Sequence, residues 1–269
     1  MTVKFKNTDL PDIIELKNVC QTYDNGKSHV IKDLDMLVED IPGQGQFIVV
    51  LGASGCGKST LLRYIAGLQT PTKGEVLIKG KPREEADRIG MVFQQYSSFP
   101  WMSVVENVAL GLEYKGVAKK ERIEKAMEMI KIVGLEGHEK KYAKYPTLSG
   151  GQLQRVAIAR SLLVNQDIIL MDEPFGALDT YTRLHMQEFL LKIWEKVNLT
   201  VIFVTHDINE AVYLGEQVFI MSANPGQIVE KIDIEMPANR NRDLKRSKQF
   251  VDMVYYIEDK MMSIQKAEA

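Results

Sequence analysis

Cysteine is scarce in this chain of 269 residues, which contains only Cys20 and Cys56. Two cysteines cannot form the disulfide framework that stabilises small secreted proteins. The chain is nevertheless long enough to bury a large hydrophobic core without covalent cross-links. We therefore expect both thiols to be reduced, and we expect a single domain over residues 1–269.

Long apolar runs are also missing. The most apolar segments, such as Phe47–Leu51 and Ile168–Met171, have the length of strands, whereas a membrane helix needs about 20 apolar residues. Residues Met1–Asp12 are polar and charged, without the apolar stretch of a secretory leader. We expect a soluble cytoplasmic protein, for which any work at a membrane requires a partner that spans it.

The chain also lacks an excess of charge of either sign. The 34 lysines and arginines nearly balance the 36 acidic residues, which gives a net charge of −2. A nucleic-acid-binding protein normally carries a basic surface. The basic run Lys119–Arg122 is most simply a solvated helix face. Composition therefore gives no support for nucleic acid as a partner.

A glycine-rich octet stands between an apolar run and an amphipathic pattern. Residues Gly52–Ser59 read GASGCGKS and fit the pattern G-x-x-x-x-G-K-S. The run Phe47–Leu51 predicts a buried strand before the octet, and apolar residues at helical spacing predict a helix after it. Strand, loop and helix in this order are what a phosphate-binding loop requires. The alternative, a glycine-rich turn with a surface lysine, explains neither the full octet nor its flanks.

The residue types of the octet suit a triphosphate. Glycines let backbone N–H groups approach phosphate oxygens without a Cβ in the way, and the positive end of the following helix points at the same anion. Lys58 would place its charge against the β- and γ-phosphates, and Ser59 would offer its hydroxyl to Mg²⁺. The residues expected to bind the nucleoside triphosphate here are Gly52, Ser54, Gly55, Cys56, Gly57, Lys58, Ser59 and Thr60.

Strand and helix patterns alternate along the rest of the chain. We expect strands at 13–23, 29–39, 75–78, 89–93, 168–171 and 200–204, edge strands at 218–221 and 228–234, and a turn at 24–27. Helices are expected within 103–134, from 149 to about 165, at 180–196 and at 208–214. This order predicts an α/β fold with a mostly parallel core sheet. It also predicts an N-terminal antiparallel part, a helical subdomain at about 96–160, and a charged helix or frayed tail at about 241–269.

Two carboxylates follow the apolar strand at 168–171. In parallel sheets the carboxyl end of such a strand lies beside the phosphate loop. Asp172 is therefore expected to hold Mg²⁺, directly or through water, and Glu173 to act as the general base on the attacking water. Alone the pair could be a solvated strand end, but the intact phosphate loop upstream favours catalysis.

Three further side chains are candidates on weaker grounds. His206 follows another apolar strand and could donate to the γ-phosphate or position the water. Gln94 also ends a strand and could orient Mg²⁺ or water, while Tyr23 precedes a turn and could stack on a base. Purely structural roles for all three stay open on the residues alone.

A second glycine-rich helix start occurs at Leu148–Gln152, which reads LSGGQ. The N-terminus of such a helix attracts an anion. This one has no lysine, so it would bind phosphate only weakly by itself. It is best explained as half of a site that another chain completes.

Together these motifs resemble the ATP-binding subunit of an ABC (ATP-binding cassette) transporter, over nearly the whole chain. The resemblance identifies Gly52–Ser59 as the Walker A motif, Leu148–Gln152 as the signature, and Asp172 with Glu173 as the end of the Walker B motif. It also assigns the D-loop to Ala177–Asp179, the switch histidine to His206, the Q-loop to Gln94 and the adenine-stacking aromatic to Tyr23.

The family's mechanism implies the partners. A head-to-tail dimer of cassettes, most simply a homodimer, would hold ATP between one Walker A motif and the opposite signature. The residues implied there are Ser149, Gly150, Gly151 and Gln152, with Asp179 of the D-loop. The resemblance implies catalysis by Glu173, His206 and Gln94, with ATP and Mg²⁺ as cofactors and Ser59, Gln94 and Asp172 as the Mg²⁺ ligands.

Membrane partners are implied as well: transmembrane permease subunits and an extracytoplasmic solute-binding protein, with the cassette at the cytoplasmic face of the membrane. Pro100–Met102 is a candidate for part of the permease contact, and a Trp101 buried in the helical subdomain is the alternative. Residues 99–112 and 221–228 resemble cassettes of nitrate, sulfonate, taurine or bicarbonate importers. Cassettes do not touch the cargo, so its identity stays open.

Two other classes of protein use the same phosphate loop. Non-transport ABC proteins that act on DNA or ribosomes usually carry long coiled-coil insertions or two cassettes, and this chain shows neither. P-loop kinases and switch GTPases lack the LSGGQ segment. The transporter ATPase is therefore the favoured hypothesis.

Overall fold

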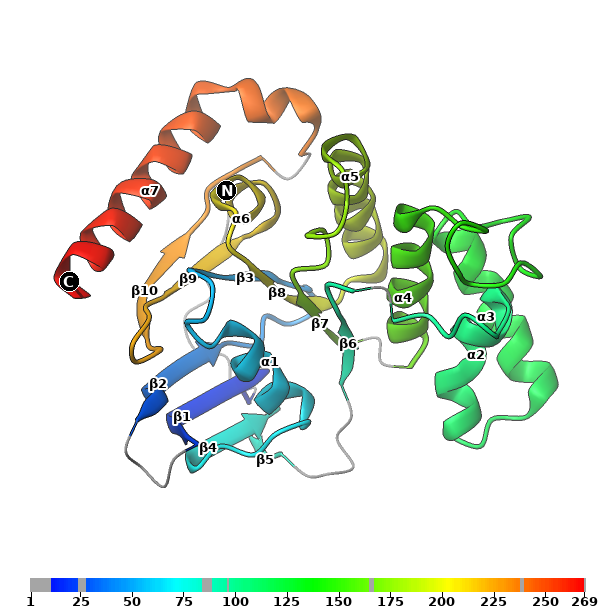
Figure 1. Ribbon diagram of the computed structural model, residues 1–269, viewed down its shortest axis with the longest axis horizontal. Helices are drawn as coiled ribbons and strands as arrows, with labels where there is room; N and C mark the ends of the chain where they lie inside the picture. The colour runs from blue at the N-terminus through cyan, green and yellow to red at the C-terminus, as the bar shows by residue number, and fades with distance from the viewer. Residues whose placement is uncertain are drawn as a thin grey trace. The chain divides into compact units, whose positions relative to one another are not determined.

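The computed structural model describes residues 11–23, 28–83, 89–95, 97–164, 167–237 and 240–268, with side chains to residue 266. The turn predicted at 24–27 lies outside the described residues. The chain forms two compact units (Figure 1). The first combines Met1–Ile89 with Ile202–Ala269, and the second is Gly90–Val201.

An antiparallel sheet occupies the first unit. Its strands, in the order β2-β1-β4-β5, are β2 (His29–Val38), β1 (Ile14–Thr22), β4 (Lys73–Ile78) and β5 (Lys81–Pro82). Ile14 pairs with Val38 on one side and with Ile78 on the other. Burial alternates at the start of β1 and in the second half of β2, as predicted, but the three successive residues Val19–Gln21 of β1 are all buried. The short strand β5 was not predicted.

A second sheet of the first unit carries the glycine-rich octet. Its strands there are β10 (Ile228–Asp233), β9 (Gln217–Met221), β3 (Phe47–Gly52) and the Ile202–Thr205 part of β8 (Thr200–Thr205), in that order. All six residues of β3 are buried, and Phe47 packs on Phe203 with ring centroids 5.9 Å apart. The prediction that β9 is an edge strand was wrong, because β9 pairs with β3 in parallel and with β10 in antiparallel fashion.

The helices of the first unit are α1 (Lys58–Ala66), α6 (Ile208–Leu214), the short 3₁₀ helix η1 (Arg242–Arg246) and α7 (Lys248–Glu268). The tail is therefore a regular helix rather than a frayed end. Phe250 and Ile257 bury one side of α7. Lys260 pairs with Glu230 of β10 at 2.7 Å, and Figure 1 shows α7 running beside that strand.

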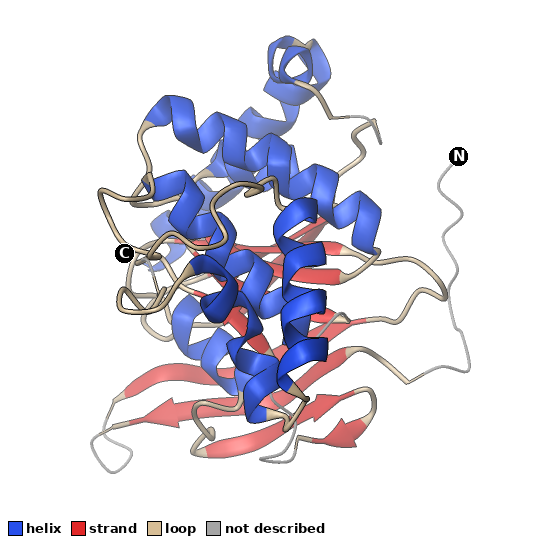
Figure 2. Cartoon of the chain, turned by 90° about the vertical axis from the view of Figure 1, so that its right-hand side faces the viewer, coloured by secondary structure: helices blue, strands red, loops and turns tan. Residues whose placement is uncertain are grey.

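The second unit is mostly helical (Figure 2). Its elements are β6 (Gly90–Val92), α2 (Val104–Tyr114), α3 (Lys119–Ile132), α4 (Gly150–Val164), β7 (Ile168–Asp172) and α5 (Thr180–Val197). Strands β6 and β7 pair in parallel, and α2 packs against both α3 and α4. Ser103 and Glu106 begin α2 with a capping box. The predicted helical subdomain, 96–160, falls within this unit.

This architecture confirms the predicted α/β fold class. Strands β3 and β9 pair in parallel, as do β6 and β7, and residues from the N-terminal part form an antiparallel sheet. A mostly helical region lies between β6 and β7 in the sequence. Antiparallel pairing also occurs near the end of the chain, between β9 and β10, which the sequence did not indicate. None of the described helices is long and apolar enough to cross a membrane.

Candidate active site

The octet forms a tight loop between β3 and α1. Gly55 and Gly57 have φ values of 84° and 106°, which side chains with a Cβ rarely adopt. Gly57 is the N-cap of α1, and its carbonyl accepts the Leu61 N–H at 2.9 Å. The first N–H groups of the helix have no partner within the helix itself. The loop therefore has the backbone shape that lets N–H groups face an anion.

Lys58 lies inside this loop, with only 5% of its surface exposed. Its Nζ donates to the carbonyl oxygens of Gly52 and Ala53, both at 2.8 Å. These bonds hold the ammonium group at the mouth of the loop and compensate the cost of burying a charge. The position places a positive charge where the phosphates of a nucleotide in the loop would lie.

The base of the loop is closely packed. Cys56 is 1% exposed, and a Cβ on Gly52 would lie 2.9 Å from its Sγ. A Cβ on Gly226 would overlap the carbonyl oxygen of Cys56 and lie 2.8 Å from Cε of Met221. Gly226 is itself tied to β2, because its N–H donates to the Val30 carbonyl at 2.9 Å. The segment between β9 and β10 therefore supports the loop from behind.

Tyr23 lies in the first unit, just beyond β1. Its side chain is 65% exposed, and its hydroxyl accepts a hydrogen bond from Nε2 of Gln69 at 3.1 Å. Gln69 follows the last turn of α1, so this bond connects the end of β1 to the helix that begins at the loop. An exposed ring held at its hydroxyl is available for stacking, and the stacking role stays a prediction.

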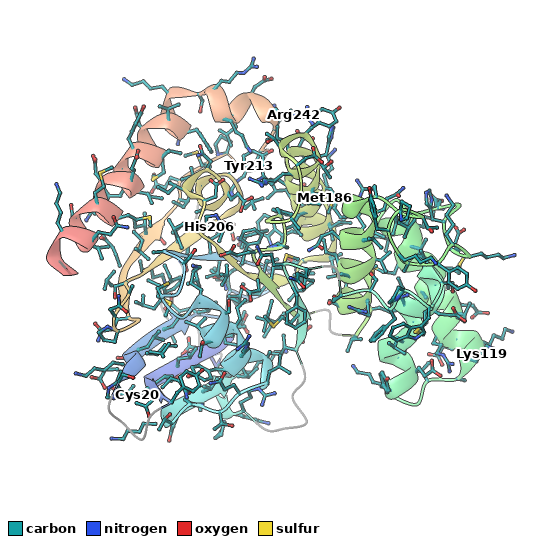
Figure 3. All side chains as sticks on the ribbon, viewed as in Figure 1. Cys20, Lys119, Met186, His206, Tyr213 and Arg242 are labelled. Carbon is teal, nitrogen blue, oxygen red and sulfur yellow. The ribbon has the colours of Figure 1, made fainter. Side chains whose placement is uncertain are left out.

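His206, which is labelled in Figure 3, also belongs to the first unit, where it follows β8. Its side chain is exposed. The residues beside it are fixed by hydrogen bonds. The buried Thr205 hydroxyl donates to the Glu210 carboxylate at 2.7 Å and accepts the Asp207 N–H at 3.0 Å. Asp207 caps α6 by accepting the N–H groups of Asn209 and Glu210. The backbone that carries His206 is thus anchored on both sides.

Asp172 and Glu173 end β7 in the second unit, and both are partly exposed. Glu173 has φ of 44°, a left-handed conformation that costs a non-glycine residue about 1–3 kcal/mol. Gln94 approaches the same turn, since a Cβ on Gly176 would lie 2.7 Å from its Nε2. The structure therefore brings Gln94 close to the turn that begins with Glu173.

The signature segment begins α4 and is capped by its own side chains. The Ser149 N–H donates to Oε1 of Gln152 at 2.9 Å, and the Gln152 N–H donates to Oγ of Ser149 at 3.3 Å. This is a capping box with glutamine in the third position. Ser149 is exposed and Gly150 partly exposed, while the Gly151 Cα faces Thr182 of α5. A Cβ there would lie 2.9 Å from Cγ2 of Thr182, which explains the glycine.

Asp179 is the N-cap of α5. Its Oδ1 accepts the N–H groups of Tyr181 at 3.1 Å and Thr182 at 3.0 Å. Hydrogen bonds from the side chain and backbone of Thr182 keep the pKa of this carboxyl below its ordinary value. The structure thus records a capping role for Asp179, and a nucleotide contact stays a prediction.

Sequence reasoning assigned no role to three side chains that hold these segments. Gln154 is fully buried in α4 and donates to the Phe93 carbonyl, next to Gln94, at 3.4 Å. Arg160 donates to the carbonyl and Oγ of Ser97 at 2.9 and 2.7 Å. His138 contacts Gln152. A polar residue between apolar positions of α4 was the available signal for Gln154, whereas nothing local in the sequence singled out His138.

Trp101 is 70% exposed, so the alternative that it is buried in the helical subdomain was wrong. Phe99 packs on it with ring centroids 5.4 Å apart. Tyr142 and Tyr145, from the segment before the signature, are 55% and 73% exposed. These side chains add to other exposed aromatic residues of the chain, such as Tyr114 at 83%.

The predicted site residues thus divide between the two units. The first unit holds the octet, Tyr23 and His206, and the second holds Gln94, the signature, Asp172, Glu173 and Asp179. Each of the two glycine-rich segments begins a helix of its own unit: the first encloses the Lys58 ammonium group, and the second is capped by its own Ser149 and Gln152 side chains.

A family model described as ABC transporter matches residues 39–176, which include both glycine-rich helix starts. The chain belongs to this family. It is 50% identical over 244 residues to an uncharacterised ABC transporter ATP-binding protein of Methanocaldococcus jannaschii, covering 89% of this chain and 86% of that protein. It is 48% identical over 228 residues to the taurine import ATP-binding protein of Rhizobium johnstonii, covering 82% and 85%.

Other relatives carry the names of aliphatic sulfonate and nitrate import ATP-binding proteins. Among solved structures, a dimeric ATP-binding cassette in a post-hydrolysis state, bound to ADP and Pi, matches with a TM-score of 0.69 at 36% identity. The match covers 83% of this chain and all of that one. The predicted family and the prediction of an ATP-binding ABC transporter subunit are confirmed, and the chain is an ATPase of this family.

Proposed function

We propose that this chain is the ATP-hydrolysing subunit of a membrane importer for a small anionic or zwitterionic solute, with nitrate, sulfonates and taurine as candidate cargoes. The observation that carries the proposal is the contrast between the two glycine-rich helix starts. The one at α1 encloses Lys58, whereas the LSGGQ segment at α4 contains no lysine or arginine and is capped by its own Ser149 and Gln152 side chains. The relatives named for taurine, sulfonate and nitrate import support the cargo class.

ATP would bind with its phosphates in the loop between β3 and α1. The N–H groups of the loop and the Lys58 ammonium would bind the β- and γ-phosphate oxygens. The exposed ring of Tyr23 would stack on adenine, with Gln69 holding its hydroxyl. Ser54, Cys56 and Thr60 would contribute through the same loop and first helical turn, chiefly with their backbone N–H groups.

Mg²⁺ fits the donor set that the chain offers. Hydroxyl, carboxylate and amide oxygens are the ligands that this hard cation prefers. Ser59 stands in the first turn of α1, Asp172 ends β7, and Gln94 follows β6. These three residues would hold Mg²⁺, which when bound neutralises charge on the phosphates.

Hydrolysis needs one water and one base. Glu173 would accept a proton from a water molecule while the oxygen of that water attacks the γ-phosphorus. The bond from the γ-phosphorus to the β-γ bridging oxygen would then break, which yields ADP and phosphate. His206 would donate a hydrogen bond to the γ-phosphate, and Gln94 would help to orient the water. The strained backbone of Glu173 is in keeping with this role, because such strain clusters at functional sites.

Two copies of the chain would complete each site. The Ser149–Gln152 segment of one copy would bind the γ-phosphate held by the other copy, with Asp179 at the shared boundary. ATP would then link the copies, and hydrolysis would release them. Permease subunits would bind near the exposed Trp101 and use this closure for transport as a translocase. The complex would lie at the cytoplasmic face of the membrane and receive cargo from an extracytoplasmic binding protein.

Glu173→Gln tests the ATPase mechanism. The amide keeps the size of the side chain but cannot take a proton, so we expect ATP binding to persist while turnover falls at least about a hundredfold. The variant should accumulate as an ATP-bound dimer, visible by light scattering after gel filtration. Lys266→Ala, an exposed change in α7, serves as the control. Normal turnover by Glu173→Gln would show that another group is the base.

The cargo is tested with the transporter itself. The Glu173→Gln chain, with ATP and Mg²⁺, would be used to retain its partners from solubilised native membranes. A multi-spanning protein identified there would be reconstituted with the wild-type chain, and ATP-dependent uptake of taurine, an alkanesulfonate and nitrate would be compared. Retention of ribosomal or DNA-bound proteins alone would favour the non-transport alternative.

A further inference from the structure

His138 lies against the signature, from a loop that follows α3. Its Nε2 is 3.0 Å from Nε2 of Gln152, and its Nδ1 is 3.2 Å from the Glu136 carbonyl oxygen. Gln152 is the residue whose side chain caps the Ser149 N–H. The His138 imidazole therefore contacts the capping box of the Ser149–Gln152 segment, which would bind ATP held by a second copy.

The partners of this ring fix its tautomer. A carbonyl oxygen can only accept, so Nδ1 of His138 must carry the hydrogen that bonds to Glu136. Oε1 of Gln152 is occupied by the Ser149 N–H, so the side-chain NH₂ group faces the imidazole. Neutral Nε2 then accepts from Gln152, and all of these groups are satisfied at once. A cationic ring would present donors on both nitrogens and could not accept.

The loop that carries His138 is itself held firmly. The His138 N–H donates to the Leu135 carbonyl at 3.1 Å, and the His138 carbonyl accepts the Lys141 N–H at 2.9 Å. The first N–H groups of α2, on Val104 and Val105, donate to carbonyls of Lys141 and Glu139 at 2.9 and 3.0 Å. His138 is thus mounted on backbone that is bonded to the start of α2, next to the Trp101 segment.

We propose that His138 is a positioning residue for the signature: as a hydrogen-bond acceptor it orients Gln152, which in turn fixes Ser149 for contact with ATP on a second copy. This inference rests on the proposed ATP-linked dimer. Nothing in it involves the binding of nucleotide by the phosphate loop of the same copy. Loss of the acceptor should therefore weaken the dimer without changing the affinity of one copy for ATP.

Four variants in the Glu173→Gln background separate polarity from packing. His138→Gln places an amide oxygen where Nε2 stood, His138→Leu removes the acceptor, and His138→Lys offers donors only. Lys140→Ala is the matched control, since it changes an exposed residue of the same loop. Dimer dissociation constants at saturating ATP would come from sedimentation equilibrium, and single-copy ATP affinity from equilibrium dialysis.

We expect His138→Leu and His138→Lys to weaken dimerisation about three- to tenfold, which is the worth of one hydrogen bond. His138→Gln should stay within about twofold of the background chain, as should Lys140→Ala, and ATP affinity should be constant throughout. Dimerisation of His138→Leu equal to that of the background, or a His138→Gln as weak as His138→Leu, would overturn the proposal.

Amide hydrogen exchange separates this inference from the function on which it rests. In the monomer, His138→Leu should speed exchange at Ser149 and Gln152 about three- to tenfold, and His138→Gln should not. If the Glu173→Gln chain fails to dimerise with ATP, the proposed function falls. In that case the exchange rates at Ser149 and Gln152 still test whether His138 positions Gln152. Unchanged rates in His138→Leu would overturn this positioning role.

Discussion

Thr205 shows how a single hydroxyl can hold a catalytic segment in place. It is 2% exposed, donates to the Glu210 carboxylate and accepts the Asp207 N–H. Both bonds flank His206, so the orientation of the backbone at His206 depends on this side chain. Because Glu210 is also buried, a change at Thr205 disturbs a carboxyl group that has little contact with water.

Thr205→Val, which keeps the shape and removes the hydroxyl, should lower the free energy of unfolding by about 1–3 kcal/mol. It should also lower kcat with little effect on KM for ATP, because His206 would act only on the γ-phosphate. Urea denaturation and steady-state ATPase assays measure the two effects. Thr205→Ser keeps the hydroxyl and should retain most of both properties. Equal behaviour of the two variants would mean that the hydroxyl is unimportant.

At the scale of elements, the phosphate loop depends on a segment far away in sequence. The turn between β9 and β10 brings Gly226 against the Cys56 carbonyl, while Met221 lies beneath Gly52 and Gly57. β9 is also the parallel neighbour of β3. The loop geometry is thus determined by the strand before it, the helix after it and the β9–β10 connection together.

Gly226→Ala should therefore damage a loop that it does not belong to. The added Cβ would overlap the Cys56 carbonyl, and relief of the overlap should cost about 1–3 kcal/mol of stability and weaken ATP binding. Fluorescent-nucleotide titration measures the affinity. Gly43→Ala is the comparison, because a Cβ there meets no atom within 4 Å although φ is 69°. It should cost some stability and leave affinity intact. Unaltered affinity in Gly226→Ala would show that the loop tolerates displacement of its support.

Glu216 makes the junction of β3 and β9 sensitive to pH. Its carboxylate accepts the Phe47 N–H at 3.1 Å, yet burial raises its pKa above the ordinary value despite that bond and the nearby Arg240 charge. A raised carboxyl pKa means that the native state binds the proton more tightly than the unfolded state. Its contribution is therefore favourable below the unfolded pKa of about 4.3 and is lost as pH rises through the native value.

Glu216→Gln should consequently stabilise the protein at pH 7.5, because an amide oxygen can accept the Phe47 N–H without a buried charge. The advantage should shrink as pH is lowered toward 5. Urea midpoints measured across this range test the sign, with Glu235→Gln, an exposed position, as the reference. A pH-independent difference between Glu216→Gln and the wild type would exclude titration of Glu216 as its origin.

Much of this architecture could be predicted from the sequence, because its strands and helices follow local patterns. The six buried residues of β3 and the octet after it are an example. What could not be predicted depends on pairing between distant segments. β9 resembles an edge strand until its pairing with β3 is known, and the sequence left open whether Trp101 is an exposed contact residue or a core residue until its 70% exposure was known.

In the candidate site, too, the residues within local motifs could be predicted, whereas the residues that contact them from distant segments could not. Motif spacing was enough to choose Lys58, Ser149 and Glu173, because their types and order are specific. Their supports, such as His138 behind Gln152 and Gly226 behind Cys56, lie outside the motifs. The left-handed backbone of Glu173 also has no sequence signal, since glycine or asparagine is the usual residue at such a φ.

At the scale of the whole molecule, the proposed site residues are shared between two compact units. The phosphate loop lies in the unit built from both ends of the chain, and the signature lies in the unit between them. Nucleotide binding to one unit should stabilise the folded chain by mass action, independently of any dimer.

ATP with Mg²⁺ at a hundred times its Kd should therefore stabilise the chain by about 2.7 kcal/mol and raise Tm by about 5 °C or more. Differential scanning fluorimetry at low protein concentration measures the shift. Lys58→Ala removes the buried ammonium group of the loop and should abolish most of it. The Lys266→Ala control should show the full shift. A wild-type chain whose Tm does not respond to ATP would contradict nucleotide binding by the loop.

The two tryptophans stand in very different surroundings, and this gives the protein an intrinsic optical reporter. Trp101 is 70% exposed, whereas Trp194 is partly buried in α5. Emission from Trp101 should lie at long wavelength and be accessible to iodide, and that from Trp194 should be shielded. Any molecule that covers the Trp101 surface would shift the emission to shorter wavelength and protect it from quenching. Association with a permease could thus be followed in real time on the unlabelled chain.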